Sequence, residues 1–226
     1  MNMNSSTIPV ITIDGPSGAG KGTVAQMLAL DLNWNILDSG ALYRTLAFLM
    51  NENDISLEQF DEKANEIKKM FKVSFDPGIP GEPVKVIFNK EDITSKIRTE
   101  EIAKITSTLA TEPKIREFIK PCQREFMISP GLIADGRDMG SVVFPEAKIK
   151  IYLDASIEER AKRRQIQLKE KGMEVNMRNL ISSLEDRDLK DKNRDVSPLL
   201  IPEGAKVIDS TNLSIDEVVN KIMDLI

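Results

Sequence analysis

The sequence contains no histidine, and Cys122 is the only cysteine among its 226 residues. Without histidine, a reaction that needs an imidazole base and a metal site built on imidazole are both excluded. A single cysteine cannot form a disulfide within the chain, which favours a reducing compartment. No run approaches the roughly 20 apolar residues that span a bilayer, and the first residues lack the basic-then-apolar pattern of a secretion signal. We therefore expect a cytoplasmic protein without a membrane partner.

An excess of positive charge is also missing. The formal net charge is −5, so we expect no nucleic-acid partner held by a general positive field. Charged residues make up 30% and hydrophobic residues 41%, a balance typical of soluble globular proteins. The length fits one substantial core with a small inserted lobe.

Short apolar runs alternate with helical patterns along most of the chain. The runs cover residues 8–13, 34–38, 132–134, 149–153 and 206–208, and helical patterns between or after them include 24–32, 42–50, 156–171 and 214–225. Alternation of this kind requires parallel crossovers. The sequence therefore predicts an α/β fold with a five-stranded parallel sheet and flanking helices.

One region, residues 71–97, breaks that alternation. Proline and glycine at 77–81 separate two short β-type runs, with no long helix between them. This pattern predicts a small antiparallel insert. The residues alone leave open whether the insert is a surface elaboration or a lobe that helps to hold a substrate.

A glycine-rich segment follows the first predicted strand and precedes the first predicted helix. Glycines let the backbone wrap an anion with several N–H groups inward, and the helix N-terminus adds its positive dipole end. A lysine in the segment supplies a compact cation for the β- and γ-phosphates. The alternative is a glycine-rich turn that binds nothing. The predicted ATP-binding residues here are Gly15, Pro16, Ser17, Gly18, Ala19, Gly20, Lys21, Gly22 and Thr23.

Arginines follow the next strands, where parallel sheets bind their ligands. Arg44 begins the helix after the second strand, Ser39 lies in the turn before it, and Arg137 follows the third strand. Guanidinium groups match phosphate oxygens with two hydrogen bonds, so these three residues are candidates for one phosphate. A single arginine taken at random is more often a surface ion pair.

A second basic group lies on the helix after the fourth strand. Arg160 and Arg164 are four residues apart and share a helical face, and Arg163 lies beside them. Their spacing is similar to that of the lid arginines of adenylate kinases, which implies ATP binding by Arg160 and Arg164. The alternative is a solvated face paired with nearby glutamates. Residues 169–195, dense in charge, would form a mobile lid that excludes water.

Two aspartates end strands beside the glycine-rich segment. Asp14 ends the first strand and Asp135 the third. Either residue would organise Mg²⁺ through water, or would cap the loop that follows it. The sequence does not separate these two roles.

Four motifs together resemble the bacterial cytidylate kinases over nearly the whole chain. They cover residues 13–23, 37–44, 134–140 and 185–194, and the Lys21-Gly22-Thr23 ending is the one that adenylate-kinase-like enzymes carry. The resemblance implies transfer of a phosphoryl group from ATP to CMP or dCMP with Mg²⁺, by a protein that is usually a monomer. It also implies a kinase core at 1–66 and 109–226 with a monophosphate-binding lobe at 67–108.

The resemblance assigns individual roles as well. The implied catalytic residues are Lys21, Arg44, Arg137 and Arg194. The implied CMP-binding residues are Ser39, Arg44, Ser107, Arg116, Arg137, Asp138, Arg187, Asp191 and Arg194. Ser107 and Arg116 lie in ordinary helical sequence, where a solvated helix face is the alternative. Pro121 is expected to interrupt the helical pattern after Arg116, at a stretch where the family more often shows basic residues.

Two functions from different classes remain open at this point. The first is the kinase, with a different monophosphate such as UMP or AMP as the second choice of acceptor. The second is a nucleotide-binding switch that uses the same loop without phosphoryl transfer. A switch does not need an arginine-rich acceptor site, whereas this sequence offers Arg44, Arg137, Arg187 and Arg194.

Overall fold

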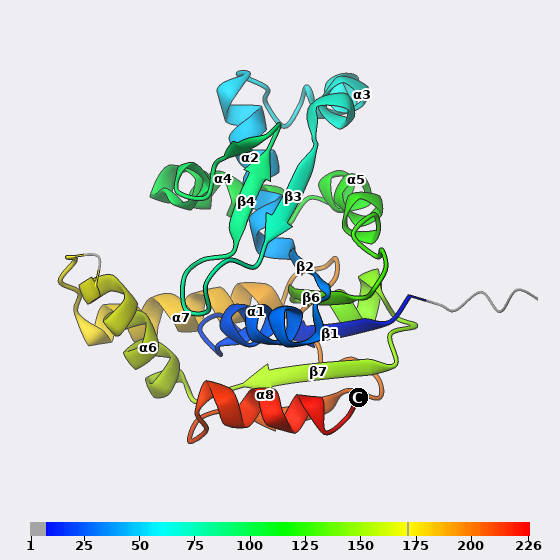
Figure 1. Ribbon diagram of the computed structural model, residues 1–226. Coiled ribbons are helices and arrows are strands. Elements are labelled where there is room, and N and C mark those ends of the chain that lie inside the picture. The colour runs from blue at the N-terminus through cyan, green and yellow to red at the C-terminus, as the bar shows by residue number, and fades with distance from the viewer. Residues whose placement is uncertain (1–7, 171) are drawn as a thin grey trace, which may run out of the picture.

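The computed structural model describes residues 8–170 and 172–226. Its centre is a five-stranded sheet in the order β2-β6-β1-β7-β8, in which every pairing is parallel (Figure 1). The parallel sheet predicted from the sequence is therefore confirmed, and each expected strand overlaps an observed one. The strands are β1 (Val10–Asp14), β2 (Asn35–Asp38), β6 (Leu132–Gly136), β7 (Ile149–Asp154) and β8 (Lys206–Asp209).

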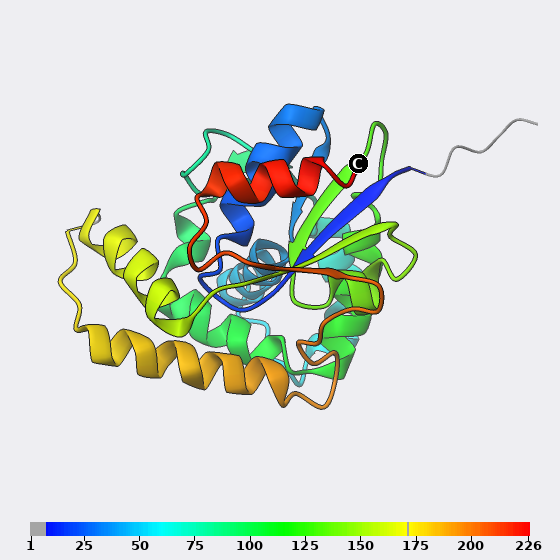
Figure 2. The same ribbon diagram turned by 90° about the horizontal axis from the view of Figure 1, so that it is seen from below.

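Helices cover both faces of this sheet (Figures 1 and 2). One face packs on α1 and α8, and the other packs on α2 and α5 through a second apolar cluster. Caps fix several starts: Asp38 accepts the Ala41 N–H at the start of α2, and Ser214 with Glu217 forms a capping box at α8. The helices are α1 (Lys21–Leu32), α2 (Ser39–Glu52), α3 (Phe60–Met70), α4 (Glu100–Leu109), α5 (Pro113–Arg124), α6 (Ile157–Glu170), α7 (Met177–Lys192) and α8 (Ile215–Met223).

The insert is a second, antiparallel sheet in the order β3-β4-β5. Its strands are β3 (Val73–Asp76), β4 (Lys85–Phe88) and β5 (Glu91–Asp92), and the short helix η1 (Lys96–Arg98) follows. Gly78 and Gly81 adopt φ values of 65° and 93° in the loop between β3 and β4, a region that favours glycine. The antiparallel insert predicted from the proline and glycine pattern is confirmed.

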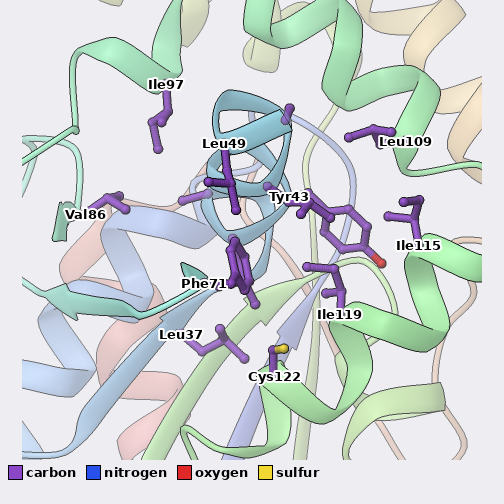
Figure 3. Close-up of a cluster of buried hydrophobic side chains, with 14 of the residues drawn as sticks. Leu37, Tyr43, Leu49, Phe71, Val86, Ile97, Leu109, Ile115, Ile119 and Cys122 are labelled. Atoms are coloured by element: carbon purple, nitrogen blue, oxygen red, sulfur yellow. The ribbon is translucent and has the colours of Figure 1, made fainter. Parts of the chain in front are cut away.

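The insert shares a core with the helices of the main sheet rather than folding apart from it. Phe71, Val86 and Ile97 lie in the same buried cluster as Leu49 of α2 and Ile119 of α5 (Figure 3). Burial of such side chains contributes roughly 1.5–3 kcal/mol each. The position of the insert over α2 and α5 is therefore set by apolar packing.

The expected interruption at Pro121 is wrong. Helix α5 continues through Pro121 to Arg124. Proline removes one main-chain hydrogen bond from a helix, but here Ile115, Ile119 and Cys122 pack into the buried cluster on one side of α5. That packing offsets the loss and keeps Arg116 and Gln123 on a continuous helix.

The carboxyl ends of β1, β6 and β7 lie at one edge of the sheet, which faces α6 and α7 (Figure 1). The glycine-rich loop follows β1, the 137–138 segment follows β6, and α6 follows β7. The glycine-rich loop, Arg137, Asp138 and Arg160 are thereby brought to a single edge, as expected for a parallel sheet. Among residues 8–170 and 172–226, no helix is long and apolar enough to cross a membrane.

Candidate active site

The glycine-rich loop connects β1 directly to the first turn of α1. Gly15, Gly18 and Gly20 have φ values of 148°, 83° and 94°. A Cβ on Gly15 would lie 2.0 Å from the main-chain oxygen of Leu153, so only glycine fits there. Gly20 has no side chain to cap α1, which leaves the first N–H groups of the helix available to an anion.

Lys21 lies inside the curve of this loop. Its Nζ donates to the main-chain oxygen of Pro16 at 2.9 Å and lies 4.0 Å from Asp135 Oδ1. Burial, together with the nearby guanidinium of Arg137, lowers the pKa of Lys21 to about 8. The nearest carboxylate oxygen lies 4.0 Å from this buried ammonium, so the ammonium would also stabilise an anion bound in the loop.

Two arginines of α6 hold the outer side of the same loop. Arg160 Nη1 donates to the main-chain oxygen of Ser17 at 3.1 Å, and Arg163 Nη1 donates to that of Ala19 at 3.3 Å. Arg160 also pairs with Asp188 of α7 at 2.7 Å. With these two carbonyls turned outward, the N–H groups of the loop are free to face a phosphate.

The three arginines of α6 lie in different surroundings. Arg160 is buried against the loop and α7, whereas Arg164 is exposed and donates to Gln167 at 3.4 Å. Arg163, considered only a neighbour in the sequence, also donates to the Ser210 main-chain oxygen at 2.7 Å. Arg164 remains close enough to Arg44 and Arg187 to lower the pKa of both guanidinium groups, after the larger effect of burial.

On the other side of the edge, several of the predicted acceptor residues lie close together. Arg137 Nε donates to Asp191 Oδ2 at 2.8 Å, and Arg194 Nη1 lies 3.9 Å from Asp191 Oδ1. Desolvation and the guanidinium of Arg137 lower the pKa of Arg187, whose side chain still reaches solvent. Arg44 donates to the main-chain oxygen of Ile97 at 3.4 Å.

Arg194 has buried hydrogen-bond donors that lack an acceptor among the described residues. Its side chain is 8% exposed, and among the described residues its Nε and Nη2 are buried without a hydrogen-bond partner. Burial and the guanidinium of Arg116 lower the pKa of Arg194. Buried guanidinium donors normally find acceptors, so these two nitrogens would bind an anionic ligand such as a phosphate.

Asp138 and Arg116 form a buried ion pair deeper in the site. Asp138 is 4% exposed and accepts from Arg116 Nη2, while Arg116 Nη1 donates to the main-chain oxygen of Ala110 at 3.0 Å. The Arg116 guanidinium lies 5.7 Å from the centre of the Tyr43 ring. The solvated-face alternative for Arg116 is therefore wrong, whereas Ser107 lies exposed on α4, outside this pair.

Ser39 begins α2 and is buried beside α5. Its hydroxyl accepts from Gln123 Nε2 at 2.8 Å. Sequence reasoning missed Gln123, although its position seven residues after Arg116 places both on one helical face. That spacing was an available signal.

The two strand-end aspartates differ in their surroundings. Asp14 accepts the N–H groups of Met139 and Gly140, each at 2.8 Å, so it caps the π-helical turn η2 (Met139–Val143). Burial raises the pKa of Asp14 to about 7 against the effect of those two hydrogen bonds. Asp135 instead faces Lys21 and the start of α1, and burial raises its pKa to about 6. Of the two carboxylates, that of Asp135 faces the lysine of the loop.

A parallel sheet with a glycine-rich phosphate loop after its central strand defines an α/β protein of the P-loop class. The cytidylate kinase family model matches residues 11–226. A cytidylate kinase of Colwellia psychrerythraea is 53% identical over 221 residues, covering 98% of this chain and 96% of that protein. One of Aeromonas salmonicida is 48% identical over 215 residues, covering 95% and 92%. The chain therefore belongs to the cytidylate kinase family.

Solved structures of other kinases align less closely. A shikimate kinase from Acinetobacter baumannii aligns with a TM-score of 0.44 and 18% identity, covering 97% of this chain and 93% of that chain. A TM-score at this level supports no conclusion about function.

Proposed function

We propose that this protein catalyses ATP-dependent phosphorylation of CMP and dCMP to CDP and dCDP. The observation that carries the proposal is that Arg194, beside Arg137, has a buried Nε and Nη2 without a hydrogen-bond partner among the described residues, opposite a phosphate loop that contains Lys21. Two phosphate-binding regions at one sheet edge suit a reaction between two phosphorylated nucleotides. A nucleotide switch, the other class considered, needs only the first of them.

The donor side would hold ATP. The N–H groups of the 15–23 loop and the Lys21 ammonium would bind the β- and γ-phosphates. Arg160 and Arg163, which hold the loop carbonyls outward, would keep those N–H groups in position. The exposed Arg164 would contact ATP directly.

The acceptor side would hold the monophosphate. Arg44, Arg137 and Arg194, with Ser39, would bind its phosphate, and Asp191 with Arg187 would bind the ribose hydroxyls. Asp138 would accept a hydrogen bond from the exocyclic amine of cytosine, supported by Arg116, with Ser107 at the edge of the base. Uracil lacks that amine, and an acceptor left unpaired costs about 1–3 kcal/mol.

The chemistry would be a direct in-line transfer. An oxygen of the acceptor phosphate forms a bond to the γ-phosphorus of ATP as the bond from that phosphorus to the β–γ bridging oxygen breaks, and ADP leaves. The attacking oxygen is already anionic, so no base is required, which agrees with a chain without histidine. Catalysis would rest on positioning and on neutralisation of the transferring group by Lys21 and the arginines.

Mg²⁺ would be held mainly by the phosphates and by water, with Asp135 as the nearby carboxylate. Within the described part of the chain, no group of three or more Asp, Glu or Cys side chains is placed to hold a metal ion by itself, which fits a metal that arrives with ATP. When bound, Mg²⁺ supplies additional neutralisation of the phosphate charge.

The chain would be organised as a kinase core with an inserted lobe and a lid. Residues 67–108 would form the monophosphate-binding lobe of a kinase core at 1–66 and 109–226. Residues 169–195, which include α7 with Arg187 and Asp191, would move as a lid. We further propose a cytoplasmic monomer without a nucleic-acid partner, consistent with the net charge of −5.

The decisive experiment is an ADP-release assay with Mg-ATP and a panel of nucleoside monophosphates. We expect CMP and dCMP to give the highest kcat/KM. A preference for AMP or GMP would overturn the acceptor assignment. Absence of transfer to every monophosphate tested would favour the switch.

A further inference from the structure

Gln26 joins the phosphate-loop helix to the insert. It lies in α1, within two turns of Lys21, and is 2% exposed. Its Nε2 donates to the main-chain oxygens of Pro77 at 2.7 Å and Glu82 at 2.8 Å. Both acceptors belong to the loop between β3 and β4, residues 77–84, which we call the hairpin loop. Both amide hydrogens of Gln26 are thus used on one loop.

Apolar packing adds to this attachment. Val84, at the end of the hairpin loop, is buried in the cluster that contains Val24 and Ala25 of α1. The rest of the insert packs mainly in the other cluster, with α2 and α5. The hairpin loop is therefore the part of the insert that reaches across to the donor side of the molecule (Figure 1).

From the hairpin loop, further contacts lead to the acceptor side. Arg98 of η1 donates through Nη2 to the Val84 main-chain oxygen at 3.4 Å, and this same nitrogen lies 3.9 Å from Asp38 Oδ2. Asp38 in turn accepts the Ala41 N–H at 2.9 Å and caps α2. That helix begins with Ser39 and carries Arg44, both proposed to bind the acceptor phosphate.

We propose that Gln26 is a positioning residue for the acceptor nucleotide, although it lies on the helix that binds the donor. It holds the hairpin loop on α1, and through Arg98 and Asp38 it maintains the insert against the start of α2. This inference rests on the proposed function, because it takes a nucleoside monophosphate as the acceptor. A residue that only supported the phosphate loop would affect ATP binding instead.

The two roles predict different changes in the Michaelis constants for CMP and for ATP. Gln26→Glu keeps the shape of the side chain but places an oxygen where an N–H faced two carbonyl oxygens. We expect KM for CMP to rise roughly five- to tenfold, the effect of losing one or two hydrogen bonds, with KM for ATP changed less than about twofold. An equal rise in both constants, or no rise for CMP, would overturn the proposal.

Control variants distinguish a specific effect of Gln26 from a general effect of the added charge or of lost stability. Gln59→Glu makes the same chemical change at an exposed position, where the side-chain oxygen already accepts the Ser56 N–H, and we expect wild-type constants. If Gln26→Glu does not fold, Gln26→Met removes both donors without adding charge and carries the same expectation for KM. Thermal unfolding of each variant identifies a general loss of stability.

Hydrogen exchange tests the attachment of the hairpin loop to α1 without any substrate. Amide hydrogen exchange of the non-proline residues of the hairpin loop should become faster in the Gln26 variant than in wild type, with little change in α8. Unchanged exchange in this loop would contradict the attachment. Failure of the wild-type protein to phosphorylate CMP would refute the proposed function but leave this exchange test intact. Normal CMP turnover with an unchanged KM in both Gln26 variants would refute the inference alone.

Discussion

Arg137 and Asp191 form an ion pair across the acceptor side of the site, with 2.8 Å between Nε and Oδ2 and a separation of 54 positions in the chain. Burial opposes ionisation of Asp191, but the guanidinium groups of Arg137 and Arg194 hold its pKa below the usual range. Asp191 therefore offsets part of the positive charge of these arginines. A bound monophosphate would share the arginines with Asp191.

Replacing Asp191 with alanine tests its proposed contact with the ribose. We expect KM for CMP to rise roughly tenfold, since a hydrogen bond to a charged group contributes about 1.5–3 kcal/mol, and KM for ATP to change little. Asp191→Asn keeps the shape, removes the charge beside Arg137, and should show a smaller rise. Steady-state kinetics with each nucleotide varied in turn measures both constants. An unchanged KM for CMP in Asp191→Ala would place the ribose elsewhere.

Lys21→Ala tests the phosphate loop. Loss of a preorganised cation at the transferring phosphate should lower kcat by at least about 100-fold, while circular dichroism and the melting temperature remain close to those of wild type. Lys162→Ala is the matched control, because the Lys162 side chain is 65% exposed on α6. Turnover near the wild-type rate in Lys21→Ala would refute the role of this lysine.

Asp138→Asn tests the choice of base. The ion pair between Asp138 and Arg116 is buried, and the proposed hydrogen bond to the cytosine amine needs an acceptor at that carboxylate. We expect the ratio of kcat/KM for CMP over UMP to fall roughly tenfold, because the Asn oxygen would face Arg116 and its NH₂ group, a donor, would face the cytosine amine. Asp186→Asn, at an exposed position of α7, should leave the ratio as in wild type. Equal losses with CMP and UMP would show that Asp138 has no part in distinguishing them.

The reactivity of the Cys122 thiol tests whether this side chain of α5 is buried. Its Sγ donates to the main-chain oxygen of Phe118 at 3.4 Å, and desolvation, with the nearby Glu125, raises the pKa of the thiol to about 11. At pH 8 about one thiol in a thousand would then be ionised. We expect Ellman's reagent to label native protein at least about 100-fold more slowly than protein unfolded in urea. Rapid stoichiometric labelling of the native protein would contradict this environment.

Much of the fold followed from local patterns. The strands at 10–14 and 132–136 are short β-branched or apolar runs. Because a strand buried on both faces is apolar along its length, it can be recognised in the sequence without knowing which strands it pairs with. The proline and glycine punctuation at 77–81 was enough to indicate a hairpin. Pro121 was misread because a local helix-breaking preference was outweighed by the packing of α5 against the core.

The arginines of α6 show why side-chain contacts are harder to predict from sequence than strands and helices. Arg160, Arg163 and Arg164 lie within five positions of one helix, and sequence spacing paired Arg160 with Arg164. In the folded chain Arg160 and Arg163 reach the loop carbonyls, while Arg164 is exposed. A difference of one residue is about 100° around a helix, so the orientation of α6 on the sheet decides which of them touch the loop.

By itself, the sequence determined the order along the chain of the five parallel strands and of several helices, the glycine-rich loop and the place of Lys21 within it. These features depend on residues that are adjacent in the chain, where backbone preference and periodicity act directly. Only the tertiary structure decided that Arg137 pairs with Asp191, that Arg116 is buried against Asp138, and that Gln26 holds the hairpin loop. Such contacts join residues far apart in sequence, and they exist only once apolar packing has fixed how the helices and the insert lie on the sheet.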